Sequence, residues 1–213
     1  MPNRSRFIAL ALAALLLLAL GAGCRRAPAV AQEGPSGSLA VAGFDVPASS
    51  GEVLGGYLDD GVPAVRPEDL DSLDAALLQG LSRGPALGPQ AVRQCEETVL
   101  AGETGSRRAL GHWLAVGRCL DVDWLLVPQV TAWHEREGSD VSVRRPASVT
   151  LWLHLVDVRG ESFGARYKFE ETQQSLTENF LKAGKFIERG GKWVSAGELA
   201  REGVAAGLKE LGL

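Results

Sequence analysis

The stretch from Trp124 to Trp133 constrains the fold of this chain more than any other segment. It reads WLLVPQVTAW, and as far as Val127 both alternating sets of side chains are apolar. A strand of that kind must be covered on both faces, as central strands are in sheets packed between helices. Pro128 has no amide hydrogen, so we expect it at a bulge or near the end of the strand.

Helices and a short strand are predicted before this central strand. Leucines at positions 70, 73, 77 and 81 fall on one side of a helix, and Asp69 and Asp71 lie at its start, where carboxylates suit the helix dipole. The other expected elements are a buried strand at Leu39–Phe44, a glycine-rich loop at 49–61, and helices from Pro89 to about Leu100 and from Arg107 to Leu120.

A β-hairpin is predicted after the central strand. His134 to Asp140 reads as a charged turn. Apolar residues then alternate along Val149–Val158, and Phe163–Glu170 is the expected return strand. Gly160–Gly164 fits the G-x-S-x-G pattern of a nucleophile elbow, but an elbow needs a helix after the serine, and all three histidines precede it. We therefore interpret this motif as part of the hairpin.

The chain is expected to end in a helix. Ser175–Glu178 and Ser195–Glu198 both have the spacing of a capping box, which begins helices. In the last helix Gly203 and Gly207 fall on the apolar stripe, which indicates close packing on the sheet. Together these patterns predict one α/β domain over residues 38–213, with a mixed central sheet, helices on both faces, a C-terminal hairpin and a terminal helix.

The N-terminus has the three parts of an export signal. Two arginines precede an apolar stretch at residues 7–23, which is shorter than the roughly 20 residues that cross a bilayer core. The small residues before Cys24 resemble the bacterial lipobox, although Leu20 stands one place earlier than usual. This resemblance implies a signal peptide at 1–23, a lipid on Cys24 and a flexible tether at 24–37.

Two other interpretations of the leader are a retained transmembrane helix and cleavage after Ala29–Ala31, which would release a soluble protein. Arg25 follows the cysteine where an inner-membrane retention signal has Asp. The expected location is therefore the outer membrane, with the lipid-anchored domain facing the periplasm.

Two cysteines remain for the domain. Cys95 and Cys119 could pair in an oxidising compartment, or both could be small buried apolar residues. A disulfide between them would stabilise the fold by roughly 3 kcal/mol. The sequence leaves both alternatives open.

The remaining motifs argue against several classes of function. The net charge is −4, so there is no basic excess for nucleic acid. The histidines and cysteines lack the spacing of metal ligands. The loop at Gly51–Gly61 lacks the Gly-Lys-Ser/Thr of a phosphate site, and Gly190–Lys192 is followed by Trp193 and not by a hydroxyl residue. We therefore expect no catalytic residue, metal, cofactor or small-molecule substrate.

Trp193 is the candidate partner contact. It follows Arg189 and Lys192 in a connecting segment. An aromatic side chain beside basic residues is typical of interface anchors. The alternative is that Trp193 packs under the last helix.

Three segments resemble one superfamily of envelope proteins. They are Gly117–Val127, with its G-x-x-L-x-x-D pattern, the hairpin at Leu155–Glu161, and the opening strand at Leu39–Phe44. The superfamily includes the amino-terminal domain of TolB, the curli-secretion lipoproteins and the lipoprotein activator of penicillin-binding proteins. The resemblance implies a mixed α/β sandwich without catalytic residues. It does not extend to the pore of the curli-secretion members, because the hairpin carries His154, Lys168 and Glu170.

The sequence thus predicts a membrane-anchored, non-catalytic protein-interaction module in envelope assembly or transport. Its partner is an envelope protein or a second copy of itself. The alternative is an oligomeric secretion-channel subunit.

Overall fold

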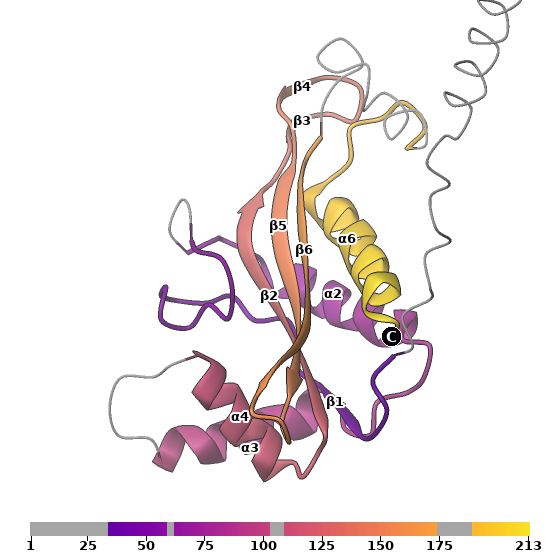
Figure 1. The fold of residues 1–213 in the computed structure, drawn as a ribbon. Coiled ribbons are helices and arrows are strands. Elements are labelled where there is room, and N and C mark those ends of the chain that lie inside the picture. The colour runs from indigo at the N-terminus through magenta and orange to yellow at the C-terminus, as the bar shows by residue number, and fades with distance from the viewer. Residues whose placement is uncertain (1–33, 59–61, 103–108, 174–188) are drawn as a thin grey trace, which may run out of the picture. The chain divides into compact units, whose positions relative to one another are not determined.

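Four strands form the central sheet, in the order β1–β2–β5–β6. The computed structural model describes residues 34–58, 62–102, 109–173 and 189–213. Strand β1 is parallel to β2, whereas β5 is antiparallel to both β2 and β6, so the predicted mixed sheet is confirmed (Figure 1). The strands are β1 (Leu39–Val41), β2 (Trp124–His134), β5 (Ser148–Asp157) and β6 (Ser162–Thr172).

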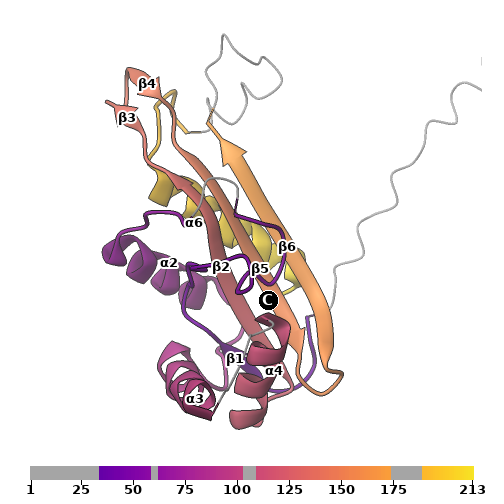
Figure 2. The same cartoon turned by 90° about the vertical axis from the view of Figure 1, so that its left-hand side faces the viewer.

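Helices cover both faces of the sheet, as the sequence predicts. Helices α2 (Pro67–Gly80) and α6 (Ala196–Leu211) lie on one face, and α3 (Pro89–Gly102) and α4 (Ala109–Cys119) lie on the other. Figure 2 shows this arrangement, with α6 behind the sheet and α4 in front of it. No helix in the described residues is long and apolar enough to span a membrane.

Strand β2 contributes to two separate cores. Leu126 and Val130 belong to the core under α2 and α6, and Leu125 and Val127 belong to the core under α3 and α4. All four side chains are fully buried. The doubly apolar pattern therefore reflects burial on both faces.

Pro128 lies in the middle of β2, opposite Leu153, and not at a bulge or at the strand end. The bulge comes at Thr131. Proline is tolerated here because β1 has already ended at Val41. The carbonyl of Pro128 accepts a hydrogen bond from the Asp45 amide at 3.0 Å, and no strand of the described sheet needs the missing amide hydrogen on that side.

The hairpin turn explains the G-x-S-x-G pattern. Asp157 Oδ1 accepts a hydrogen bond from the Gly160 amide at 2.7 Å, and Ser162 begins β6. A Cβ at Gly164 would lie 2.3 Å from the Trp124 ring, so this glycine allows the indole to pack on the hairpin. The motif is a strand–turn–strand unit, as predicted.

Helix α6 begins and packs as predicted. Ser195 and Glu198 form both hydrogen bonds of a capping box. A Cβ at Gly203 would lie 2.6 Å from the Phe169 ring, and one at Gly207 would lie 2.5 Å from Leu153. The two glycines therefore allow the helix to approach the sheet closely. The other predicted box, Ser175–Glu178, lies outside the described residues.

Two predicted boundaries are wrong. The segment 134–140 is not a simple turn, because it enters a two-stranded sheet formed by β3 (Glu137–Gly138) and β4 (Val143–Arg145). The first strand ends at Val41 and not at Phe44. Beyond it, the Phe44 amide donates a hydrogen bond to Asp74 Oδ1 at 2.6 Å, so the regular ladder is interrupted before the chain bonds to β2 again at Asp45.

Candidate functional site

Asp123 joins the start of the domain to the sheet. Its Oδ2 accepts hydrogen bonds from the amide and the hydroxyl of Ser38, both at 2.8 Å, and its Oδ1 accepts one from Arg159 at 3.0 Å. The amide of Ser38, its hydroxyl and then Arg159 lower the pKa of Asp123 to about 2. The aspartate of the G-x-x-L-x-x-D motif therefore has a structural role.

The predicted tether is bonded to the domain at its end. The Ser36 carbonyl accepts a hydrogen bond from the Trp124 indole at 2.9 Å, and the Pro35 carbonyl accepts one from Arg83. Residues 34–37 thus belong to the folded domain. Cys24, the predicted lipid attachment site, lies outside the described residues.

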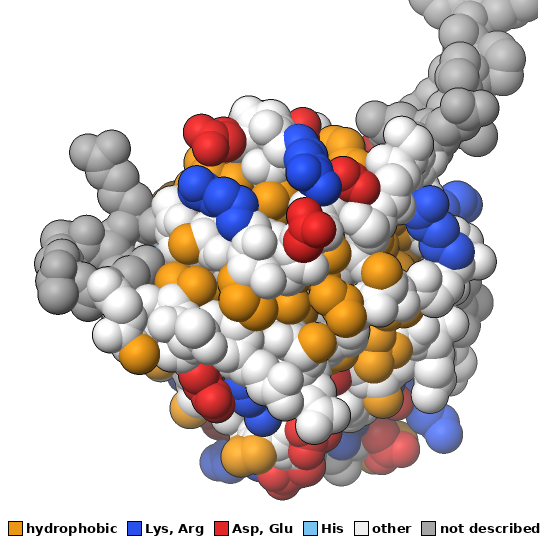
Figure 3. Space-filling view, turned by 90° about the horizontal axis from the view of Figure 1, so that it is seen from below, with side chains coloured by type: hydrophobic (Ala, Val, Ile, Leu, Met, Phe, Trp, Pro, Cys, Tyr) orange, Lys and Arg blue, Asp and Glu red, His pale blue; other side chains and the backbone are white. Residues whose placement is uncertain are grey.

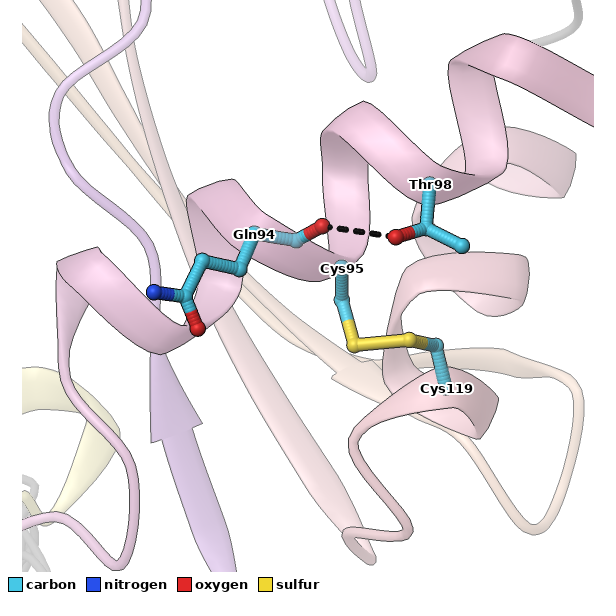
Figure 4. Close-up of a disulfide and its surroundings, with 4 residues drawn as sticks. All are labelled: Gln94, Cys95, Thr98 and Cys119. Atoms are coloured by element: carbon cyan, nitrogen blue, oxygen red, sulfur yellow. Dashed lines mark hydrogen bonds between the residues drawn. A yellow bond between two sulfur atoms is a disulfide. The ribbon is translucent and has the colours of Figure 1, made fainter.

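A disulfide joins Cys95 of α3 to Cys119 at the end of α4, with their Cα atoms 5.8 Å apart (Figure 4). Cys95 is half-buried and Cys119 is exposed. The bond therefore crosses from the core under these helices to the surface. Of the two alternatives left open by the sequence, the structure has the paired one.

Trp193 connects two segments that are distant in the sequence. Its amide donates a hydrogen bond to the Asp140 carbonyl at 2.8 Å, and its carbonyl accepts one from the Arg136 guanidinium. Because Asp140 lies in the turn between β3 and β4, the segment at 189–193 is attached to that small hairpin. Both lie at the same end of the domain in Figure 1.

The exposed part of this end combines apolar and basic groups. Val141, in the turn, is 79% exposed, Lys192 is exposed, and Trp193 is half-buried. We call Arg136, Val141, Lys192 and Trp193 the hairpin-end surface. It resembles interface anchors in composition, since it combines an aromatic residue with an apolar one and two cationic ones.

Arg189 is not part of this surface, although the sequence groups it with Lys192 and Trp193. Its guanidinium contacts Glu202 at 2.6 Å and Glu171 at 2.9 Å, and its side chain is only 8% exposed. Hydrogen bonds to Glu202 and Glu171 raise its pKa. Arg189 thus joins β6 to α6 and has little surface to offer a partner.

A cleft opens beyond the end of β1, between α2 and α3. It has a volume of about 220 Å³ and is rich in carboxylates, with Arg93 among them. Burial raises the pKa of both Asp45 and Asp74. Asp45 accepts a hydrogen bond from Gln129, and Asp74 accepts one from the Phe44 amide. Both carboxylates therefore help to fix the segment that follows β1.

A smaller cavity of about 120 Å³ adjoins this cleft at Asp45, Glu96 and Trp113. There His112 Nε2 lies 3.5 Å from the carboxylate of Glu96. Across the residues that the structure covers, no group of three or more His, Cys, Asp or Glu side chains is arranged to hold a metal ion.

His154 is a fully buried polar residue in β5. The sequence does not indicate that this histidine is buried. Neither ring nitrogen has a hydrogen-bond partner in the described part of the chain. The ring stacks on Trp152 with centroids 5.5 Å apart, and a Cβ at Gly55 would lie 2.9 Å from it. Burial, followed by the charge of Arg166, lowers the pKa of His154 to about 4.

Figure 3 shows the opposite end of the domain from below. Apolar side chains form a band there, with acidic and basic side chains on either side. The hairpin-end surface is therefore not the only exposed area of mixed character.

No family model and no curated protein matches the chain. It is similar to several solved structures. The PelC dodecamer from Paraburkholderia phytofirmans is 15% identical with a TM-score of 0.41, over 87% of this chain and 92% of that one. The LpoB C-terminal domain from Salmonella enterica is 13% identical with a TM-score of 0.36, over 64% of this chain and 84% of that domain. Lipoprotein GNA1162 from Neisseria meningitidis is 19% identical with a TM-score of 0.34, over 72% and 93%. At these values the similarity is too distant to establish a shared activity.

Proposed function

We propose that this chain is a bacterial envelope lipoprotein, anchored by a lipid on Cys24, and that its α/β domain binds a protein partner without catalysing a reaction. The observation that supports the binding role is the hydrogen bond from Trp193 to Asp140. It brings two distant segments together as the hairpin-end surface. The domain faces the periplasm from the outer membrane.

The chemistry of this surface suggests what the partner presents. Trp193 offers a large rigid ring, and Val141 adds exposed apolar area. Arg136 and Lys192 are cationic. A partner segment with an apolar side chain flanked by carboxylates would match these groups.

The anchor is tested by changing Cys24 to Ser. Two or three acyl chains, at about 0.8 kcal/mol per buried CH₂, hold a protein on a membrane without a spanning helix. We expect metabolic labelling with palmitate to be lost in Cys24→Ser and the protein to leave the membrane fraction. Cys119→Ser is the control, and it should label as the wild type does. Equal labelling of Cys24→Ser would contradict the anchor.

The partner surface is tested by photocrosslinking in cells. With a photoreactive residue in place of Trp193, we expect one envelope protein to be captured. Lys192→Glu should reduce its yield several-fold, because a charge reversal at an interface repels an acidic partner. The same photoreactive residue at Lys209, which is exposed on α6, is the control and should capture no such protein. Identical products from both positions would contradict the surface.

The alternative is a secretion-channel subunit. Strands β5 and β6 have 10 and 11 residues, a length that suits a membrane-crossing strand. However, β5 pairs with β2 along its whole length, and α6 packs against β5 and β6. Detergent-resistant rings after extraction would favour the channel, and a monomer that co-purifies with one envelope protein would favour the adaptor.

A further inference from the structure

Residues 51–58 form a loop that lies on the sheet at the middle of β5 (Figure 2). We call this segment the covering loop. A Cβ at Gly55 would lie 2.9 Å from the His154 ring, and one at Gly56 would lie 3.0 Å from the Trp152 ring. Because neither glycine has a side chain, the backbone of the covering loop lies directly against these two rings.

A buried amide side chain holds the covering loop on the sheet. Gln129 of β2 accepts a hydrogen bond from the Leu54 amide at 2.9 Å and donates one to the Glu52 carbonyl at 3.0 Å. The side chain of Leu54 is also buried, in the core under α3 and α4. The loop is thus attached mainly through Leu54 and Gln129, so it can open without unfolding the sheet.

His154 cannot readily take up a proton while the loop covers it. The ring is fully buried, and neither nitrogen has a hydrogen-bond partner among the described residues. A histidinium has two N–H donors and a charge, and both are costly to bury without a partner. Arg166 of β6 lies opposite His154 in the sheet and is cationic. Burial and then the charge of Arg166 lower the pKa of the ring. A proton therefore binds more readily once water reaches the ring.

The other titratable groups near this place do not offset the proton. Lys168 of β6 lies over the neighbouring indole and is itself cationic. Of the carboxylates, Glu52 accepts a hydrogen bond from a backbone amide close to it in the chain, and Asp45 accepts one from the amide side chain of β2. Strand β2 places a valine opposite the histidine. Among the described groups, the charge that acts on the ring is therefore the positive one of Arg166.

We propose that the covering loop opens in acid: protonation of His154 releases residues 51–58 from the sheet and exposes the rings beneath, while the rest of the domain stays folded. This inference goes beyond the proposed partner surface. It concerns other segments of the domain and needs neither the lipid nor the envelope partner.

The direction of the change with pH follows from the two environments of the ring. An exposed histidine has a pKa near 6.5, whereas the covered ring has one of about 4. The preference for the covered form is therefore fully present above pH 6.5 and is lost as the pH falls towards 4. At pH 5 the equilibrium constant for opening should be about 30-fold greater than at neutral pH.

The test is amide hydrogen exchange on the full chain in detergent, followed by mass spectrometry at pH 7.5 and pH 5. Exchange times are adjusted for the change in the chemical exchange rate with pH. In the wild type, protection of peptides that cover residues 51–58 should fall at least about tenfold at pH 5. Peptides from α6 report unfolding of the whole domain, and their protection should fall much less.

Three variants assign the response to the histidine. His154→Leu should remove it, because the leucine takes up no proton. Arg166→Glu places a carboxylate opposite His154, which stabilises the histidinium under the closed loop, so the response should shrink several-fold. Asp45→Asn is the control, because burial raises the pKa of Asp45 and this group also titrates in acid. The asparagine keeps an oxygen that can accept the bond from Gln129, and this variant should respond as the wild type does.

Three results would overturn the inference. They are loop peptides with the same protection at both pH values, a loss of protection that is equal in the loop and in α6, and a His154→Leu variant that responds like the wild type. The second result would mean that acid unfolds the domain as a whole. None of them bears on the palmitate or photocrosslinking experiments.

Discussion

Replacing His154 with Leu is expected to remove most of the acid sensitivity of the fold between pH 6.5 and pH 4. In the wild type the buried ring has a pKa of about 4, whereas a histidine in the unfolded chain has one near 6.5. Between these values the unfolded chain binds a proton that the folded protein does not bind. The stability that the neutral, buried His154 contributes is therefore fully present above pH 6.5 and is lost as the pH falls towards 4.

The size of the effect follows from the shift in pKa. Each unit corresponds to about 1.4 kcal/mol, so the wild type should lose roughly 3 kcal/mol over this range because of His154. Burial raises the pKa of Asp45 and Asp74, and these carboxylates act in the opposite direction. They are present in both proteins, so the difference between wild type and variant isolates the histidine.

The measurement is urea unfolding at a series of pH values. At pH 7 His154→Leu should be at least as stable as wild type, because two buried nitrogens without partners among the described residues cost about 1–3 kcal/mol each in a folded protein. His134→Leu, which removes a half-buried histidine of β2, is the control and should keep the acid sensitivity. If the difference in the free energy of unfolding between wild type and His154→Leu does not change with pH, His154 is hydrated in solution.

Reduction of the disulfide between Cys95 and Cys119 should lower the free energy of unfolding by about 3 kcal/mol. The two cysteines are 24 residues apart, and the loop that they close restricts the unfolded chain. Reductants can reach the bond because Cys119 is exposed. The check is the urea midpoint with and without reductant.

A matched variant tests the cause of this loss. The double change Cys95→Ala and Cys119→Ala should have the stability of the reduced wild type and should not respond to reductant. Cys24→Ser should respond as the wild type does. An unchanged wild-type midpoint under reducing conditions would mean that the bond does not form.

Local patterns predicted the elements that depend on local physics. The capping box at Ser195 needs only a hydroxyl and a carboxylate at a fixed spacing. The hairpin at 157–162 needs alternation and a turn. Gly203 and Gly207 indicated close packing because glycine is otherwise unfavourable in a helix, and the structure confirms that contact.

Other features depend on where neighbouring segments go. Pro128 is accommodated because the segment after β1 bonds to its carbonyl, through the Asp45 amide, and this arrangement is not encoded in β2 alone. Arg189 stands near Trp193 in the sequence, but Glu171 and Glu202 lie beside it in space. His154 occupies an ordinary place in an alternating strand, and its burial depends on the loop that crosses it at Gly55.

The sequence by itself determined the fold class, because a strand that is apolar on both faces must lie between helices. It also predicted the leader, through a charged start and an apolar run before Cys24. Only the tertiary structure decided which polar groups lose contact with water and which surfaces remain exposed. Both outcomes depend on contacts between residues far apart in the chain. The burial of His154 and the hydrogen bond from Trp193 to Asp140 are examples.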